Sequence, residues 1–138
     1  MTNSEEYIKK LRKSGLRPTN QRIKICQVLF NTDMTFHFTI KDLVEMIQEK
    51  ANQKISLATV YNTVHAFEKK GYLKEIAINS NQTYFDTNTT DHHHFFDEKN
   101  KRLIDLTNED IHPIKIKKDI PGKKIKSIEV LVRVDTDN

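Results

Sequence analysis

Three adjacent histidines, His92, His93 and His94, follow Asp91 and precede two phenylalanines. Alternate side chains of a β-strand share a face, so we expect His92 and His94 on one face and Asp91 and His93 on the other. Imidazole nitrogens bind Zn, Fe, Mn and haem iron, and carboxylate oxygens shift the preference towards harder ions. The run therefore predicts a metal or haem site, with surface decoration as the alternative.

A small metalloenzyme is the second function that this run allows. Hydrolysis would need a metal with an open position and a nearby general base. Glu98 is the only close acid without another assignment, and it lies past the strand. The sequence also lacks G-x-S-x-G, H-E-x-x-H and a glycine loop for phosphate. We therefore expect a binding protein that is not an enzyme, with a His-ligated hydrolase as the alternative.

The elements that would position these residues change from helical to strand-like after Gly71. Hydrophobic periodicity and capping residues predict four helices, at residues 4–13, 20–30, 40–51 and 56–71. Two strand-like runs, 73–78 and 82–86, flank a polar turn and predict a hairpin. Helices followed by a hairpin in this order are the anatomy of a winged helix-turn-helix.

The C-terminal part of the sequence predicts a second, smaller domain. Strand-like runs occur at residues 92–96, 102–106 and 125–134, with a short helical or irregular passage at 108–118. We therefore expect an α+β fold with a winged-helix DNA-binding domain at 1–86 and a hinge at 87–90. Residues 91–138 would form a small α/β sensing and dimerisation domain with a three-stranded antiparallel sheet. The run at 125–134 is apolar on both faces, which predicts a homodimer through this sheet.

The charge distribution and the cysteine content narrow the functional class of the protein further. Residues 1–75 carry 13 Lys and Arg against 8 Asp and Glu, whereas residues 76–138 carry 10 against 11. This asymmetry indicates an N-terminal half that faces nucleic acid. The single cysteine, Cys26, excludes an internal disulfide and a structural zinc held by four cysteines. No apolar run approaches the ~18 residues of a membrane span, so we expect a cytoplasmic protein.

The helix at 56–71 has small and hydrogen-bonding side chains opposite its apolar stripe. Small residues let the backbone approach the major groove, and Asn and Thr offer donors and acceptors to base edges. Phosphates would be met by Lys54, Lys69, Lys70 and the basic N-terminus. An ordinary surface helix is the alternative. The predicted DNA-facing residues of this helix are Ser56, Ala58, Thr59, Tyr61, Asn62 and Thr63.

Two segments carry a resemblance to a known family. They are Leu16-Arg17-Pro18-Thr19-Asn20-Gln21-Arg22 and Ile55-Ser56-Leu57-Ala58-Thr59-Val60-Tyr61-Asn62-Thr63-Val64, which resemble two motifs of the ferric uptake regulator family. Asn62 and the histidine run before Phe95-Phe96 are similar to its iron response regulator branch, whose members are dimeric regulators of iron and haem genes. The resemblance implies that Arg17 enters the minor groove, that Thr19 and Arg22 contact DNA, and that Tyr61 contacts thymine edges.

The resemblance also implies two ligand sets. The regulatory metal site would use His37, Asp86, His92 and His94, and a second metal or haem site would use Asp91, His93 and His112. The first set draws on both predicted domains, so one ion would fix the angle between the two recognition helices of a dimer. The family's C-x-x-C is replaced here by Asp97 and Asn100, which again excludes a structural zinc bound only by thiolates.

Together these features predict a sequence-specific transcription regulator, mainly a repressor of iron and haem homeostasis genes. It would bind a palindromic operator in double-stranded DNA as a homodimer and would respond to Fe, Mn or Zn, with haem as a further candidate. The sequence leaves open which effector is physiological, whether the effector promotes or releases DNA binding, and which genes are controlled.

Overall fold

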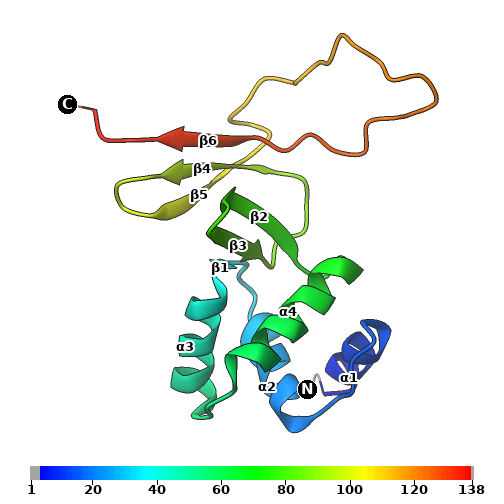
Figure 1. Ribbon diagram of the computed structural model, residues 1–138, viewed down its shortest axis with the longest axis vertical. Helices are drawn as coiled ribbons and strands as arrows, with labels where there is room; N and C mark the ends of the chain where they lie inside the picture. The colour runs from blue at the N-terminus through cyan, green and yellow to red at the C-terminus, as the bar shows by residue number, and fades with distance from the viewer. Residues whose placement is uncertain (1–3, 138) are drawn as a thin grey trace. The chain divides into compact units, whose positions relative to one another are not determined.

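The computed structural model describes residues 4–137, and the chain divides into two units between Thr89 and Thr90 (Figure 1). The first unit contains four helices, α1 (Ser4–Lys13), α2 (Asn20–Phe30), α3 (Ile40–Ala51) and α4 (Leu57–Lys70). It also contains a sheet of β1 (His37–Phe38), β2 (Lys74–Asn79) and β3 (Gln82–Asp86). The second unit contains β4 (His93–Asp97), β5 (Arg102–Leu106) and β6 (Leu131–Val134).

Side-chain caps fix where the helices of the first unit begin. The Thr39 hydroxyl accepts the backbone N–H of Asp42 at 3.1 Å, and the Asp42 carboxylate accepts the Thr39 N–H at 3.0 Å, a complete capping box at the start of α3. Ser56 caps α4 by accepting the N–H of Thr59. Gly71 ends α4 with φ at 90°, a left-handed conformation that glycine adopts without steric cost.

The four helices and the small sheet of the first unit share one hydrophobic core. Aromatic and aliphatic side chains from every helix meet there, and Phe38 and Phe67 are fully buried. The ring of Phe67 packs edge-on against Phe30, with centroids 5.6 Å apart. On α1, Lys10 covers the core edge by placing its ammonium 4.4 Å from the Phe30 ring and 4.3 Å from the Tyr72 ring.

The sheet of the first unit runs in the order β1-β3-β2, with both pairs antiparallel. The strands β2 and β3 form the predicted hairpin, which is the wing that follows α3 and α4. The sequence predicts no strand between the helices at 20–30 and 40–51, but His37 and Phe38 pair with Asp86 and Phe85 as β1. Two residues are too few to show the alternation of polar and apolar side chains that marks a strand in a sequence. The strand β1 forms only because β3 lies beside it.

The sheet of the second unit corrects two predictions. Its order is β5-β4-β6, and β6 runs parallel to β4, so the sheet is mixed and not antiparallel throughout. Only Leu131–Val134 of the run at 125–134 forms a strand, and residues 108–118 are irregular. Pro113 lacks the N–H that a helix requires, and Pro121-Gly122 makes a turn, with the Lys123 N–H bonded to the Ile120 carbonyl.

No helix is assigned between Thr90 and Asp137, so both faces of this sheet lack a helical cover from their own unit. Within residues 4–137, every helix is too short and too polar to cross a lipid bilayer. The helices of the first unit and the two small sheets together make an α+β architecture.

Candidate metal centre and DNA-binding surface

The first unit brings together two of the predicted metal ligands. His37 of β1 and Asp86 of β3 are register partners, and His37 Nε2 lies 3.8 Å from Asp86 Oδ2. The other carboxylate oxygen of Asp86 accepts the N–H of Asn88 at 2.8 Å, which fixes the orientation of the carboxylate. The wing sheet therefore presents one imidazole nitrogen and one carboxylate oxygen side by side.

The second unit brings together His92, His94 and Asp105. His92 and His94 lie on one face with ring centroids 4.5 Å apart, as the alternation of a strand predicts. Asp105 of β5 is the register partner of His94, and its Oδ1 lies 3.4 Å from His94 Nε2 and 3.6 Å from His92 Nε2. Sequence reasoning missed Asp105, although an acid inside the apolar run Leu103-Ile104-Asp105-Leu106 was a visible signal.

The tautomer of His92 is set by its backbone neighbour. His92 Nδ1 lies 2.7 Å from the carbonyl oxygen of Thr90, and since a carbonyl only accepts, Nδ1 carries the hydrogen. In the neutral ring, Nε2 then presents a lone pair towards the Asp105 carboxylate. Nε2 lies 3.6 Å from the Asp105 carboxylate, and metal-ligating histidines commonly donate their other N–H to a carbonyl in this way.

The exposed face of α4 carries most of the predicted DNA contacts. Ser56, Ala58, Tyr61 and Asn62 are exposed, with Tyr61 at 51% of its full exposure, and Thr59 is half-buried. The Tyr61 ring stacks on His65 one turn later, with centroids 5.7 Å apart and planes 12° from parallel. This stacking at a spacing of four residues restricts the rotamer of Tyr61 and holds its ring away from the core.

Thr63 does not belong to this face. Its side chain is fully buried, and its hydroxyl donates to the Thr59 carbonyl at 2.8 Å, so the prediction that Thr63 contacts DNA is wrong. Thr63 is buried because of its position around the helix axis. Successive residues are 100° apart, so a residue three after Val60 and four before Phe67 lies on the same apolar face as those two side chains.

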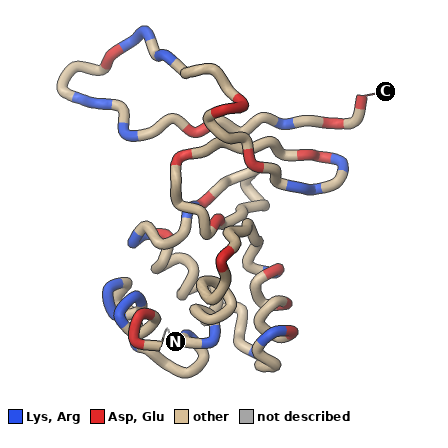
Figure 2. The backbone as a smooth tube through the Cα atoms, turned by 180° about the vertical axis from the view of Figure 1, so that it is seen from behind, with Lys and Arg blue, Asp and Glu red and all other residues tan. Residues whose placement is uncertain are grey.

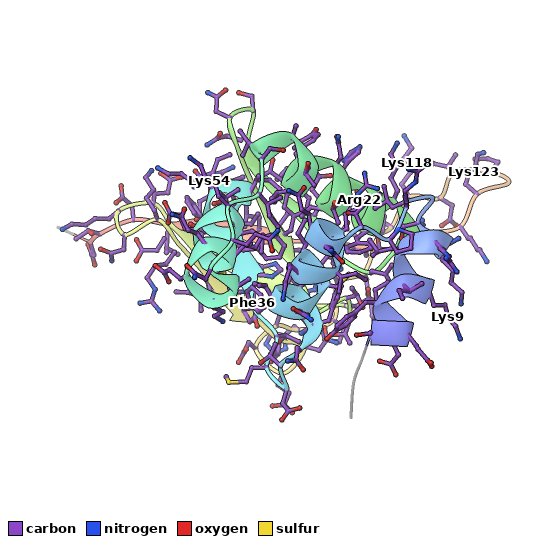
Figure 3. The ribbon with its side chains drawn as sticks, turned by 90° about the horizontal axis from the view of Figure 1, so that it is seen from below. Lys9, Arg22, Phe36, Lys54, Lys118 and Lys123 are labelled. Carbon is purple, nitrogen blue, oxygen red and sulfur yellow. The ribbon has the colours of Figure 1, made fainter. Side chains whose placement is uncertain are left out.

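The loop before α2 positions the other predicted DNA-binding residues. Arg17 and Thr19 are exposed, and the Thr19 hydroxyl caps α2 through the N–H of Arg22 at 3.3 Å. The Arg22 guanidinium donates from Nη1 to the Arg17 carbonyl at 3.0 Å, so Arg22 braces this loop. Exposed lysines stand on other edges of the unit, among them Lys9 on α1 and Lys54 between α3 and α4 (Figure 3).

Comparison with known proteins decides the family. A family model described as the ferric uptake regulator family matches residues 13–133. This chain belongs to the ferric uptake regulator family. The family consists of transcription regulators and not enzymes, so the alternative of a small hydrolase is set aside.

Two curated relatives are peroxide regulators. It is similar to the peroxide-responsive repressor PerR of Staphylococcus epidermidis, with 35% identity over 102 residues that cover 74% of this chain and 66% of the relative. The peroxide operon regulator of Bacillus subtilis is 32% identical over 102 residues, which cover 74% and 68% of the two chains. These relatives are peroxide regulators, so they lend no support to the iron response regulator branch.

Solved structures of the family share the fold. The ferric uptake regulator of Pseudomonas aeruginosa with manganese aligns with a TM-score of 0.68 at 20% identity, over 96% of this chain and 98% of that chain. The peroxide stress regulator of Campylobacter jejuni aligns with a TM-score of 0.61 at 22% identity, over 100% and 98%. The predicted α+β fold class, with a winged helix followed by a smaller second unit, is confirmed, although the described part of that second unit contains strands and no helix.

The three residues of the predicted second metal or haem site line one cavity, but one of them, His93, is not free to bind a metal. Asp91, His93 and His112 line a cavity of about 360 Å³ together with Ile128. However, His93 Nδ1 accepts the backbone N–H of Val130 at 3.1 Å, so the hydrogen of the neutral ring lies on Nε2. In this arrangement His93 has no nitrogen lone pair for a metal or for haem iron, and it ties β4 to the segment before β6.

Cys26 is the only cysteine of the chain and lies in the core of the first unit with no exposed surface. Burial raises the pKa of the Cys26 thiol to about 12, although the charge of Lys10 acts in the opposite direction. Oxidation of cysteine proceeds through an accessible thiolate. Cys26 is therefore a poorly reactive core residue and a poor target for oxidants.

Proposed function

We propose that this chain is a metal-dependent DNA-binding repressor whose regulatory ion is held by His37, Asp86, His92, His94 and Asp105. The observation that carries the proposal is the arrangement of His92, whose Nδ1 hydrogen is held by the Thr90 carbonyl while its Nε2 faces the Asp105 carboxylate. Four of the five ligands follow from the resemblance to the family, and Asp105 is added by its position on β5.

The donor set supports a divalent ion more than haem. The first unit offers one imidazole and one carboxylate, and the second offers two imidazoles and one carboxylate. A mixed nitrogen and oxygen set suits Fe, Mn and Zn. A bound divalent ion would place positive charge beside the Asp86 and Asp105 carboxylates. Haem iron takes an imidazole as its axial ligand and makes no use of carboxylates, so the two aspartates of this set favour a divalent ion over haem.

The repressor function rests on the exposed face of α4 and on the two-unit organisation. We propose that Tyr61, Asn62 and Ala58 read base edges while Arg17 and the lysines contact the DNA backbone. Two copies would bind the two halves of a palindromic operator. If the donor sets of both units share one ion, occupancy favours one arrangement of the units and thereby one spacing of the recognition helices.

Peroxide is the second input that we infer, because the curated relatives are peroxide regulators. The core position of Cys26 argues against a thiol as the sensor. The response would then depend on the ion that the histidines and aspartates hold, and a redox-active ion such as Fe²⁺ would be required. Control of iron and haem genes, which the first resemblance implied, remains the alternative physiological role.

The experiment begins with a duplex selected from a random pool by the Mn²⁺-loaded protein. Fluorescence anisotropy then measures the affinity for this duplex with Mn²⁺, with EDTA, and with Fe²⁺ before and after hydrogen peroxide. We expect tight binding with either metal, loss with EDTA, and loss after peroxide only in the Fe²⁺-loaded sample. Equal affinity with Mn²⁺ and with EDTA would rule out the metal-dependent repressor, and equal peroxide effects with Mn²⁺ and Fe²⁺ would rule out the proposed sensing ion.

A further inference from the structure

Three side chains at a spacing of four residues form a ridge along α4. Leu57, Tyr61 and His65, here called the ridge, recur about one helical turn apart and therefore lie on the same side of the helix. Exposure falls along the ridge, from 63% for Leu57 and 51% for Tyr61 to a half-buried His65. The ridge is thus anchored at His65 and projects into solvent at the start of α4, beside the exposed Ser56 and Ala58.

His65 lies between α4 and the wing. It lines a cavity of about 360 Å³ together with Tyr61, Glu75 of β2 and the wing turn at residues 80–83. Side chains of a helix tilt towards its N-terminus, so the His65 ring leans over the turn that carries Tyr61. The stacked rings, with centroids 5.7 Å apart, are the result of this tilt.

The cavity gives the Tyr61 ring a second place to go. Tyr61 and His65 line the same space, so removal of the imidazole would enlarge the volume into which the Tyr61 ring can turn away from solvent. A ring that turned in this way would no longer stand on the exposed face of α4. His65 therefore holds Tyr61 in the outward orientation.

The exposed part of the ridge is apolar on a face whose other members are small or polar. From Leu57 to Phe67, α4 carries no Lys, Arg, Asp or Glu, so this stretch is tan throughout in Figure 2. Leu57 and Tyr61 consequently have no charge with which to bind phosphate. The apolar group that bases present in the major groove is the C5-methyl of thymine, and cytosine has a hydrogen at the same position.

We infer that the ridge is a thymine-methyl reader, in which Leu57 and Tyr61 provide the contact surface and His65 is the positioning residue that keeps the Tyr61 ring in place. The inference rests on the proposed function, because it concerns the bases that α4 reads. It adds Leu57 and His65 to the residues that determine sequence specificity. His65 acts through Tyr61 and does not itself contact a base.

Replacement of thymine by deoxyuridine in the selected duplex tests the methyl contact, because it removes one methyl group at one position at a time. In anisotropy titrations with Mn²⁺, wild type should lose affinity about three- to fivefold at the position that the ridge reads, the effect of one methyl group. Leu57→Ala, Tyr61→Ala and His65→Ala should each bind the unmodified duplex more weakly and lose most of this deoxyuridine penalty. Gln48→Ala, at an exposed neutral residue of α3, is the control and should keep the wild-type profile.

Variants of His65 separate positioning from direct contact with DNA. His65→Ala should weaken binding to the selected duplex about two- to tenfold, the contribution of one aromatic pair. His65→Phe should restore the affinity, because a phenyl ring can stack on Tyr61 without donating to phosphate. The double variant Tyr61→Ala/His65→Ala should bind like Tyr61→Ala alone, since His65 acts through Tyr61.

Fluorine NMR reports the orientation of Tyr61 without metal or DNA. The chain contains four tyrosines, and in protein labelled with fluorotyrosine the variant Tyr61→Phe identifies the Tyr61 resonance. His65→Ala should move this resonance, because it removes the stacked ring, and should leave the other three resonances in place. An unchanged circular dichroism spectrum and unchanged Mn²⁺ stoichiometry confirm that the variant is folded.

Three results would overturn the inference. Deoxyuridine profiles that are the same in wild type, Leu57→Ala and His65→Ala, while Mn²⁺-dependent binding persists, would remove the ridge from methyl reading and leave the proposed function intact. Additive losses in the double variant, without restoration by His65→Phe, would assign His65 to direct contact with DNA. A wild type that binds no duplex with any metal would overturn the proposed function and the reading role with it.

Discussion

The Nδ1 atom of His92 lies 2.7 Å from the carbonyl oxygen of Thr90, and this one contact determines which ring nitrogen of His92 faces Asp105. His93, the next residue, is held in the opposite sense, because its Nδ1 accepts the N–H of Val130. Two adjacent histidines thus have different chemistry, and the difference comes from the backbone atoms beside them.

Asp105→Ala should weaken Mn²⁺ binding about 10- to 100-fold, the range found when a partner of a ligating histidine is removed, and more if Asp105 binds the ion directly. Isothermal titration calorimetry with Mn²⁺ measures this effect. Asp110→Ala is the control, since Asp110 is exposed in the same unit and bonds to Thr107. Equal Mn²⁺ affinity of Asp105→Ala and wild type would remove Asp105 from the site.

His93→Ala should retain the Mn²⁺ stoichiometry of wild type, because His93 Nδ1 is occupied by the Val130 N–H. The variant should instead lower the free energy of unfolding by about 1–3 kcal/mol, the cost of leaving a buried donor without its acceptor. Metal analysis after dialysis, combined with urea unfolding, separates the two effects. Loss of one bound ion per chain in His93→Ala would restore the second metal site.

Tyr61→Ala should weaken binding to the selected duplex by about 1–3 kcal/mol and leave binding to a scrambled duplex nearly unchanged. Lys69→Ala, at an exposed lysine of the same helix, should weaken binding to both duplexes. It should also reduce the slope of log affinity against log salt concentration by about one. Anisotropy titrations at several salt concentrations give both quantities. If Tyr61→Ala loses affinity equally on the two duplexes, Tyr61 does not read sequence.

Cys26→Ala should preserve the response to peroxide and change the pH dependence of stability. The pKa of Cys26 is raised in the folded protein from 9.0 to about 12, so folding favours the neutral thiol. The neutral Cys26 thiol makes its full contribution to the free energy of unfolding below pH 9. This contribution is lost as the pH rises from about 9 towards 12, with a slope of about 1.4 kcal/mol per pH unit. The difference between wild type and Cys26→Ala in urea unfolding at about pH 8 and about pH 10 isolates this contribution.

Gly71→Ala should destabilise the first unit by about 1–2 kcal/mol, because an L side chain at φ 90° is strained. Apart from the adjoining backbone, no atom lies within 4 Å of the position of an added Cβ, so the effect comes from the backbone conformation and not from a clash with packed neighbours. Gly71→Asn should cost less than Gly71→Ala, since asparagine tolerates the left-handed region better. Thermal unfolding of the two variants gives the comparison, and equal stability of Gly71→Ala and wild type would contradict it.

The helices of the first unit were predictable because their signals are local. Thr39 with Asp42, and Ser56 with the apolar stripe that follows it, mark helix starts without reference to the rest of the chain. The strand β1 was not predictable, since two residues form a strand only when β3 is present beside them. Thr63 was misassigned because its hydroxyl suggested exposure, whereas its angular position decided its burial.

The second unit was harder to predict because its order depends on distant partners. The β-branched run at 125–134 suggested a long strand, but only the last four residues find a neighbour, β4, which lies 37 residues earlier in register. His92 and His94 were correctly placed on one face by the period of a strand. Asp105 could be joined to them only through the register of β4 and β5, which the sequence does not encode locally.

Only Phe38 separates His37 from Thr39, the residue that starts α3 with its capping box. Phe38 is fully buried and stacks near Phe85, so this short connection has little freedom to bend. A shift of the His37 backbone would therefore reach the first turn of α3 through a single buried residue. The candidate metal ligand His37 is therefore tied closely to α3, the helix that packs beside the DNA-facing α4.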